Sequence, residues 1–138
     1  MAVARSVRES FTYVTKADRL LPPEQRSQFL LRQLTALQAS SIDTMAEFSL
    51  EGAKGTIPIG RQRWAALKIG LIGWSNFAQA SGEQVEFKRD RGRFEVHGIA
   101  VTDPASDASL GWLDQELFEE LADAVRAGAK LTDADVGN

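Results

Sequence analysis

Residues 64–77, WAALKIGLIGWSNF, hold two of the three tryptophans in the chain and five further large apolar side chains. Trp64, Leu67 and Leu71 recur at helical spacing, which predicts a helix over about 62–72. Gly70 and Gly73 then weaken a helix, so the residues from Trp74 to Phe77 are expected to form a turn that returns two aromatic rings to the core. An aromatic side chain buries roughly 150–250 Å². We therefore expect this segment to anchor the fold.

A second apolar stripe predicts a helix over about 109–127. Its apolar positions lie at helical spacing, Asp107 or Ser109 can cap its beginning, and Gly128 can end it. In a single domain, the two strongest apolar helix faces are expected to pack against each other. The expected core anchors are therefore Trp64, Leu67, Leu71, Trp74, Phe77, Leu113, Leu117 and Leu121.

Short alternating segments predict β-structure. Residues 84–87 and 93–96 alternate polar and apolar side chains around a turn at 88–92 that contains Gly92, which is typical of a β-hairpin. Ile99 and Val101 can extend the second strand. Residues 11–14 are also β-prone. The predicted fold class is α+β, with a small antiparallel sheet that includes a hairpin at about 84–101 and is packed by helices at about 62–72 and 109–127. Residues 27–38 fit either a helix, which propensity favours, or a strand.

Length and composition predict one domain. The chain has 138 residues, and its hydrophobic content of 43% is too high for a disordered protein. We expect an arm at 1–10 that is flexible or bound by a partner, a single α+β domain at 11–130 and a short tail at 131–138. The chain has no cysteine for a disulfide or a zinc-thiolate site. No apolar run approaches the ~20 residues of a membrane span, and the first residues lack the core of a secretory signal.

Charge is distributed unevenly along the chain. Residues 1–70 carry ten basic and six acidic side chains, a net charge of +4, whereas residues 71–138 carry six basic and thirteen acidic ones, a net charge of −7. An acidic helix face exposed to solvent explains this pattern, and so do two complementary surfaces that join copies of the chain head to tail. In the second case, reversing Glu116, Glu119 and Glu120 to lysine should abolish incorporation of the chain into its assembly without lowering stability. The interface candidates are Arg61, Arg63, Lys88, Arg89, Arg91, Arg93, Glu116, Glu119, Glu120 and Asp123.

Motifs for catalysis or cofactor binding are weak or lacking. The single histidine, His97, has no second histidine or cysteine with which to share a metal, and no Gly-x-Ser-x-Gly elbow accompanies it. Residues 52–56 lack the order of a phosphate-binding loop, and residues 133–138 lack that of a calcium loop. We expect no catalytic residue, cofactor or metal. The basic residues 88–93 keep nucleic-acid binding open as an alternative, although the pI of about 5.2 argues against it.

Several short motifs resemble, in order, a group of small proteins encoded among the head and tail genes of tailed bacteriophages. They are Lys-Ala-Asp-Arg at 16–19, Leu-Pro-Pro-Glu-Gln at 21–25, Phe-Leu-Leu-Arg-Gln-Leu at 29–34, Gly-Leu-Ile-Gly-Trp-Ser-Asn-Phe at 70–77 and a tail that begins Leu-Thr-Asp at 131–133. The resemblance implies a strand at about 28–34 followed by a helix.

The same resemblance implies a non-enzymatic structural or assembly protein that binds copies of itself and other virion proteins during head and tail morphogenesis. Such groups include head–tail joining proteins, minor capsid proteins and tail-assembly chaperones, the last absent from the mature particle. The expected location is the virion, assembled in the host cytoplasm. A small nucleic-acid-binding regulator and a small enzyme, such as a hydrolase or an acetyl-group transferase, remain as alternatives.

Overall fold

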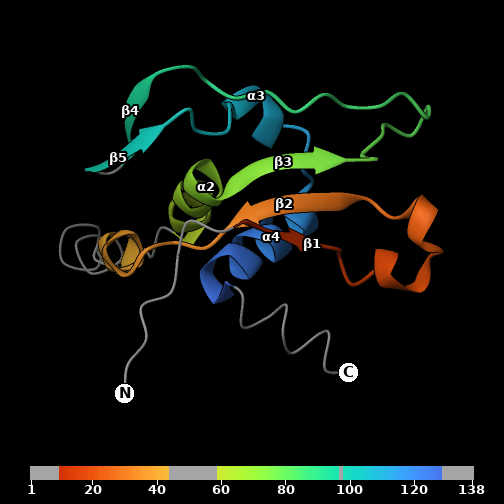
Figure 1. The fold of residues 1–138 in the computed structure, drawn as a ribbon, viewed down its shortest axis with the longest axis horizontal. Coiled ribbons are helices and arrows are strands. Elements are labelled where there is room, and N and C mark those ends of the chain that lie inside the picture. Colours follow the sequence, from red (N-terminus) through yellow and green to blue (C-terminus); the bar gives the residue numbers. More distant parts are fainter. Residues whose placement is uncertain (1–9, 44–58, 97, 129–138) are drawn as a thin grey trace.

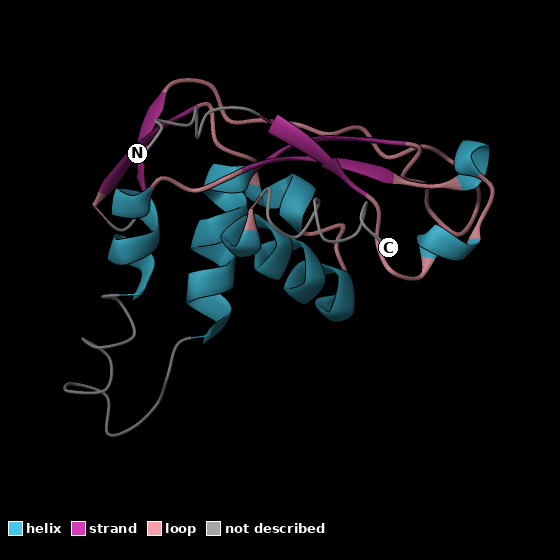
Figure 2. Ribbon diagram, turned by 60° about the horizontal axis from the view of Figure 1, so that its bottom comes forward, coloured by secondary structure: helices cyan, strands magenta, loops and turns pink. Residues whose placement is uncertain are grey.

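The computed structural model describes residues 10–43, 59–96 and 98–128, which form an α+β fold with two antiparallel sheets (Figure 1). The larger sheet contains β1 (Ser10–Tyr13), β2 (Gln28–Arg32) and β3 (Leu71–Ser75) in that order. The smaller contains β4 (Arg93–Val96) and β5 (Ile99–Thr102). The helices lie on one side of the larger sheet, as Figure 2 shows. The predicted fold class is confirmed.

Residues 27–38 form a strand and then a helix. Phe29 and Leu31 alternate with exposed neighbours in β2, and both are buried against the helices. A helix over residues 36–43 follows. Thr35 and Gln38 cap its beginning reciprocally, because each side chain accepts a hydrogen bond from the main-chain N–H of the other, over 2.9 and 3.1 Å. The implied strand and helix are confirmed here, and the continuous helix favoured by propensity is wrong.

The helix predicted over 62–72 begins earlier and ends earlier, as α2 (Ile59–Gly70). Strand β3 follows Gly70 at once, so the turn predicted over 74–77 is wrong at Trp74 and Ser75, which lie in β3. Gly70 marks the change because a Cβ there would lie 2.4 Å from Cγ1 of Val125 and 2.9 Å from the carbonyl oxygen of Arg32. The end of α2 thus lies so close to Val125 and to the main chain at Arg32 that only glycine fits there.

The single helix predicted over 109–127 is divided into α3 (Asp107–Leu110) and α4 (Gln115–Ala127). Asp114 separates them, because its side chain accepts a hydrogen bond of 2.8 Å from the N–H of Leu117 and so caps α4 as a new helix. Ser106 caps α3 in the same way through the N–H of Ser109. Gly128, with a φ of 66°, ends α4 as predicted.

The hairpin predicted to pair residues 84–87 with 93–96 is wrong in its pairing. Strand β4 pairs with β5 instead, with Arg93 opposite Thr102 and Val96 opposite Ile99. Residues 88–92 lie along residues 103–109, where Asp90 donates its N–H to the carbonyl of Pro104 over 2.9 Å. Because β4 and β5 form their own two-stranded sheet, the hairpin is not part of the larger sheet.

Hydrophobic contacts between the larger sheet, α2 and α4 make the core. Phe29, Leu31, Leu67, Leu71 and Leu121 are at most 1% exposed within it. Several sequence predictions lie outside the described residues: most of the arm at 1–10, whose last residue begins β1, the glycine-containing segment 52–56, His97 and the tail at 131–138. In the described part of the chain, no helix is both long and apolar enough to cross a membrane.

Candidate functional site

The predicted core anchors gather in one hydrophobic cluster. Leu67, Leu71 and Leu121 are fully buried within it. The remaining anchors pack against them while partly buried: Trp64, Trp74, Phe77, Leu113 and Leu117. Trp74 is fixed most closely, because its Nε1 donates a 2.7 Å hydrogen bond to the carbonyl of Val85. These residues are therefore structural in the isolated chain.

The acidic face of α4 contacts other parts of the same molecule. The carboxylate of Glu120 accepts hydrogen bonds from the hydroxyl of Tyr13, over 2.8 Å, and from the main-chain N–H of Lys16, over 2.9 Å. It thereby joins α4 to the end of β1. Reversal of Glu120 to lysine would break both bonds, so we now expect this reversal to lower stability, in contrast to the expectation from the sequence.

Two acidic candidates pair with a basic candidate inside the molecule. The guanidinium of Arg63 lies 3.2 Å from Glu119 and 3.8 Å from Asp123. These residues come from α2 and α4, which pack side by side, so Arg63 is not part of a separate basic surface. Glu116 and Arg61 are exposed and make no ion pair with other residues in the described ranges.

The basic residues 88–93 form an exposed, extended segment and not the tip of a hairpin. Its basic side chains are exposed, and Arg89 donates from Nε to the carbonyl of Asp103 over 2.7 Å. Asp103 has a φ of 51° and accepts from the N–H of Gly92 over 2.7 Å. The remaining basic candidates in this segment are Lys88, Arg91 and Arg93, which stay available to a partner.

Sequence patterns did not indicate the buried ammonium of Lys68. Its side chain is 7% exposed, lies 3.3 Å from both Asp90 and Asp107, and sits 5.6 Å from the ring centre of Trp64. Trp64 also donates from Nε1 to Asp107 over 3.0 Å. Since these residues are far apart in sequence, no local pattern could identify the group. It joins α2 to the segments before β4 and at the start of α3.

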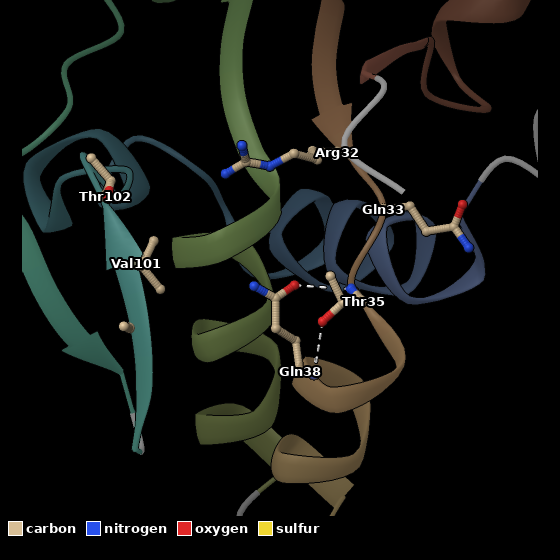
Figure 3. A pocket seen from close by; sticks show the side chains of 7 residues that line it. Arg32, Gln33, Thr35, Gln38, Val101 and Thr102 are labelled. Carbon is tan, nitrogen blue, oxygen red and sulfur yellow. Dashed lines mark hydrogen bonds between the residues drawn. The ribbon is translucent and has the colours of Figure 1, made fainter. Parts of the chain in front are cut away.

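A polar groove of about 320 Å³ lies between β5 and the beginning of the 36–43 helix (Figure 3). Arg32 reaches into this region from the end of β2 and donates to the carbonyl of Ile69 over 3.3 Å. Thr35 and Gln38 satisfy one another by capping, as described above. The other lining residues are Gln33, Ala100, Val101 and Thr102. No nucleophile–base pair is found among these lining residues.

No group of three or more His, Asp or Glu side chains within residues 10–43, 59–96 and 98–128 is placed to hold a metal ion. The structure instead contains exposed apolar side chains that the sequence analysis did not single out. The most exposed of these side chains are those of Leu20, which is 91% exposed, Leu37, at 77%, and Trp112, at 50%. The position of Leu20 and Leu21 directly before two prolines is the signal that marks this loop in the sequence.

Comparisons of the chain with protein-family models, with curated protein sequences and with solved structures found no match.

Proposed function

We propose that this chain is a non-enzymatic structural or assembly protein of a tailed bacteriophage, which binds copies of itself and other virion proteins while heads and tails are built. The proposal rests on the resemblance of its motifs to proteins encoded among phage head and tail genes. In this proposal the chain acts in the virion after assembly in the host cytoplasm, and it needs no cofactor.

The observation that carries the proposal is the contact between two of these motifs. The side-chain amide of Asn76 donates to the main-chain carbonyls of Glu24, over 3.3 Å, and Arg26, over 3.1 Å. Ser27 donates from its hydroxyl to the carbonyl of Asn76 over 2.7 Å. The motif at 21–25 and the motif at 70–77 thus support one local structure, although about fifty residues separate them.

Asn76 also explains why this motif ends in Asn-Phe. Its φ of 55° is a left-handed conformation that asparagine tolerates better than most residues. This backbone turn ends β3 and presents the amide to the loop before β2. Phe77 then returns to the aromatic cluster, with its ring centre 5.0 Å from that of Trp74 and 5.5 Å from that of Phe29. The motifs therefore encode a shaped loop and its support, which suits a binding protein.

Mass spectrometry of purified particles tests the proposal. Particles from cells that carry the gene should contain the chain at a constant ratio to the major capsid protein through successive purification steps. An abundant host cytoplasmic protein, followed in the same fractions, controls for contamination.

Two other results have distinct meanings. If the chain co-purifies with phage tail proteins from infected cells but is missing from particles, the tail-assembly chaperone is the correct version. If it is missing from both, the proposed function is contradicted, and the regulator or the small enzyme takes its place.

A further inference from the structure

The loop that joins β1 to β2, residues 14–27, is held in a defined shape by its own side chains. Arg26 donates from Nε to the carbonyl of Leu21 over 2.8 Å and from Nη2 to the carbonyl of Arg19 over 3.0 Å. It therefore holds the main chain on both sides of Leu20. Asp18 accepts from the N–H of Ser27 over 2.9 Å and closes the loop. The short helical turns η1 (Asp18–Leu20) and η2 (Pro23–Gln25) lie within it.

This loop presents two leucine side chains to solvent, and Leu20 is the more exposed. Leu20 is 91% exposed and Leu21 is 38% exposed, in contrast to the buried leucines of the core. A fixed loop loses little conformational entropy when it binds, and apolar anchors held this way are typical of binding hot spots. The charged side chain next to Leu20 is turned toward the loop itself, since Arg19 donates to the carbonyl of Val14 and its guanidinium lies 5.4 Å from the ring centre of Tyr13.

The face of the larger sheet opposite the helices has a shallow hollow of about 260 Å³. Thr12, Leu30 and Gly73 lie side by side across its three strands. Leu30 is 38% exposed there, and no helix in the described part of the chain covers it. The remaining lining residues are Gln28, Trp74 and Ser75, so no charged side chain from the described part of the chain borders the hollow.

Gly73 is not required by the fold around it. A Cβ at this position would meet Leu30 at 3.8 Å, an ordinary contact, and its φ is not in the left-handed region. The neighbouring β-bulge has Ile72 as its extra residue. Glycine weakens the interior of a strand and often marks a place where another molecule approaches closely. Here it keeps the hollow open.

We propose that Leu20 of one copy of this chain inserts into the hollow over Leu30 and Gly73 of the next copy. Among the described residues the hollow is lined by no charged side chain and has an apolar floor, so it suits an aliphatic side chain whose neighbouring arginines, Arg19 and Arg26, bond within their own loop. The loop and the hollow are different surfaces, and such a contact repeats from head to tail. This inference rests on the self-association in the proposed function and assigns that role to apolar surfaces, not to the charged sets.

Disulfide cross-linking tests the contact, because the natural chain has no cysteine. Purified full-length Leu21→Cys, which keeps Leu20, is mixed with Ser75→Cys or Thr12→Cys under a mild oxidant, and intact mass separates mixed dimers from each homodimer. The matched control is Leu20→Asp/Leu21→Cys, which carries the same exposed cysteine without the leucine that inserts. At low concentration, mixed dimers with Leu21→Cys should form at least about tenfold faster than those with the control, because burial of one leucine changes the association constant by about that factor.

A second variant confirms the site. Gly73→Leu fills the hollow without a clash at its Cβ, so Gly73→Leu/Ser75→Cys should cross-link to Leu21→Cys only at the control rate while its circular dichroism spectrum stays unchanged. Equal rates for Leu21→Cys and Leu20→Asp/Leu21→Cys, or a rate that Gly73→Leu leaves unchanged, would overturn the contact. The chain could still be found in particles in that case. Conversely, a cross-link without any association with particles or with phage tail proteins would contradict the proposed function alone.

Discussion

The guanidinium of Arg63 lies 3.2 Å from the carboxylate of Glu119, which joins α2 to α4 on the surface of a single molecule. The sequence placed these two residues on opposite sides of a contact between copies. Their pairing inside one copy removes much of the reason to expect association through charge, and it directs attention to the exposed apolar loop and to the open face of the sheet.

A charge-swap double-mutant cycle measures the interaction free energy between Arg63 and Glu119. Arg63→Glu and Glu119→Arg should each lower the free energy of unfolding, and the double variant should recover most of the loss. The coupling should be about 0.5–1 kcal/mol, because both side chains remain partly exposed. Urea unfolding monitors the cycle. Arg61→Glu with Glu119→Arg is the control and should give no coupling, since Arg61 is exposed and the ion pair of Glu119 is with Arg63. Equal coupling in both cycles would contradict the assigned pair.

The ion pairs of Lys68 predict that removing the lysine charge will lower stability less than removing its two carboxylate partners. Lys68→Met should cost less than about 1 kcal/mol, because it removes the buried charge and leaves Asp90 and Asp107, which are 42% and 73% exposed, to be solvated. Asp90→Asn/Asp107→Asn should cost about 3 kcal/mol, since it leaves a buried ammonium without a counter-charge. Thermal and urea unfolding give both values. The reverse order would show that Lys68 reaches solvent easily.

Two tryptophans provide a matched comparison of core and surface. Trp74→Ala should lower the free energy of unfolding by about 3–5 kcal/mol, because its ring packs edge-on against Phe29, Phe77 and Phe87. Trp74→Phe should retain most of that packing and lose about 1 kcal/mol with the hydrogen bond to Val85. Trp112→Ala, at a half-exposed site, should change stability by about 0.5 kcal/mol or less. An unchanged melting temperature for Trp74→Ala would place that ring outside the core.

Two glycines in adjacent elements should respond in opposite ways to the same substitution. Gly70→Ala should cost about 1–3 kcal/mol, because its Cβ would overlap Val125 and the carbonyl of Arg32. Gly73→Ala should be neutral or stabilise the strand by about 0.5–1 kcal/mol. Val125→Ala should relieve only part of the Gly70→Ala defect, since the Arg32 carbonyl remains. Differential scanning calorimetry reports the three values, and similar losses at both glycines would contradict the packing described.

Much of the fold could be predicted from local patterns. The stripe that contains Leu117 and Leu121, the glycine at 128 and the apolar helix around Leu67 all identify elements that the structure contains. The errors concern boundaries and partners. Gly70 ends α2 because Val125, which is distant in sequence, leaves no room for a side chain, and Asp114 divides the last helix through a cap that several nearby residues could also have formed.

The hairpin and the interaction surfaces depended on long-range pairing. Residues 84–87 alternate as a strand does. However, the carbonyl of Val85 accepts a hydrogen bond from the indole N–H of Trp74, and its N–H donates to the carbonyl of Phe77, so the segment lies against the residues that follow β3 and not against β4. The charge map could not reveal that Glu120 binds Tyr13 or that Lys68 is buried between two carboxylates. Leu20 was visible only as a leucine before prolines, because its exposure is a property of the folded loop.

The most direct test of the proposed function is deletion of the coding sequence from the genome that carries it, followed by electron microscopy of the particles released. We expect heads or tails that fail to assemble or to join, and complete particles restored when the wild-type gene is supplied from a plasmid. Supply of a Leu20→Asp variant should restore fewer particles than a Leu37→Asp variant. Complete, infectious particles at the wild-type yield in the absence of the protein would contradict a role in phage assembly.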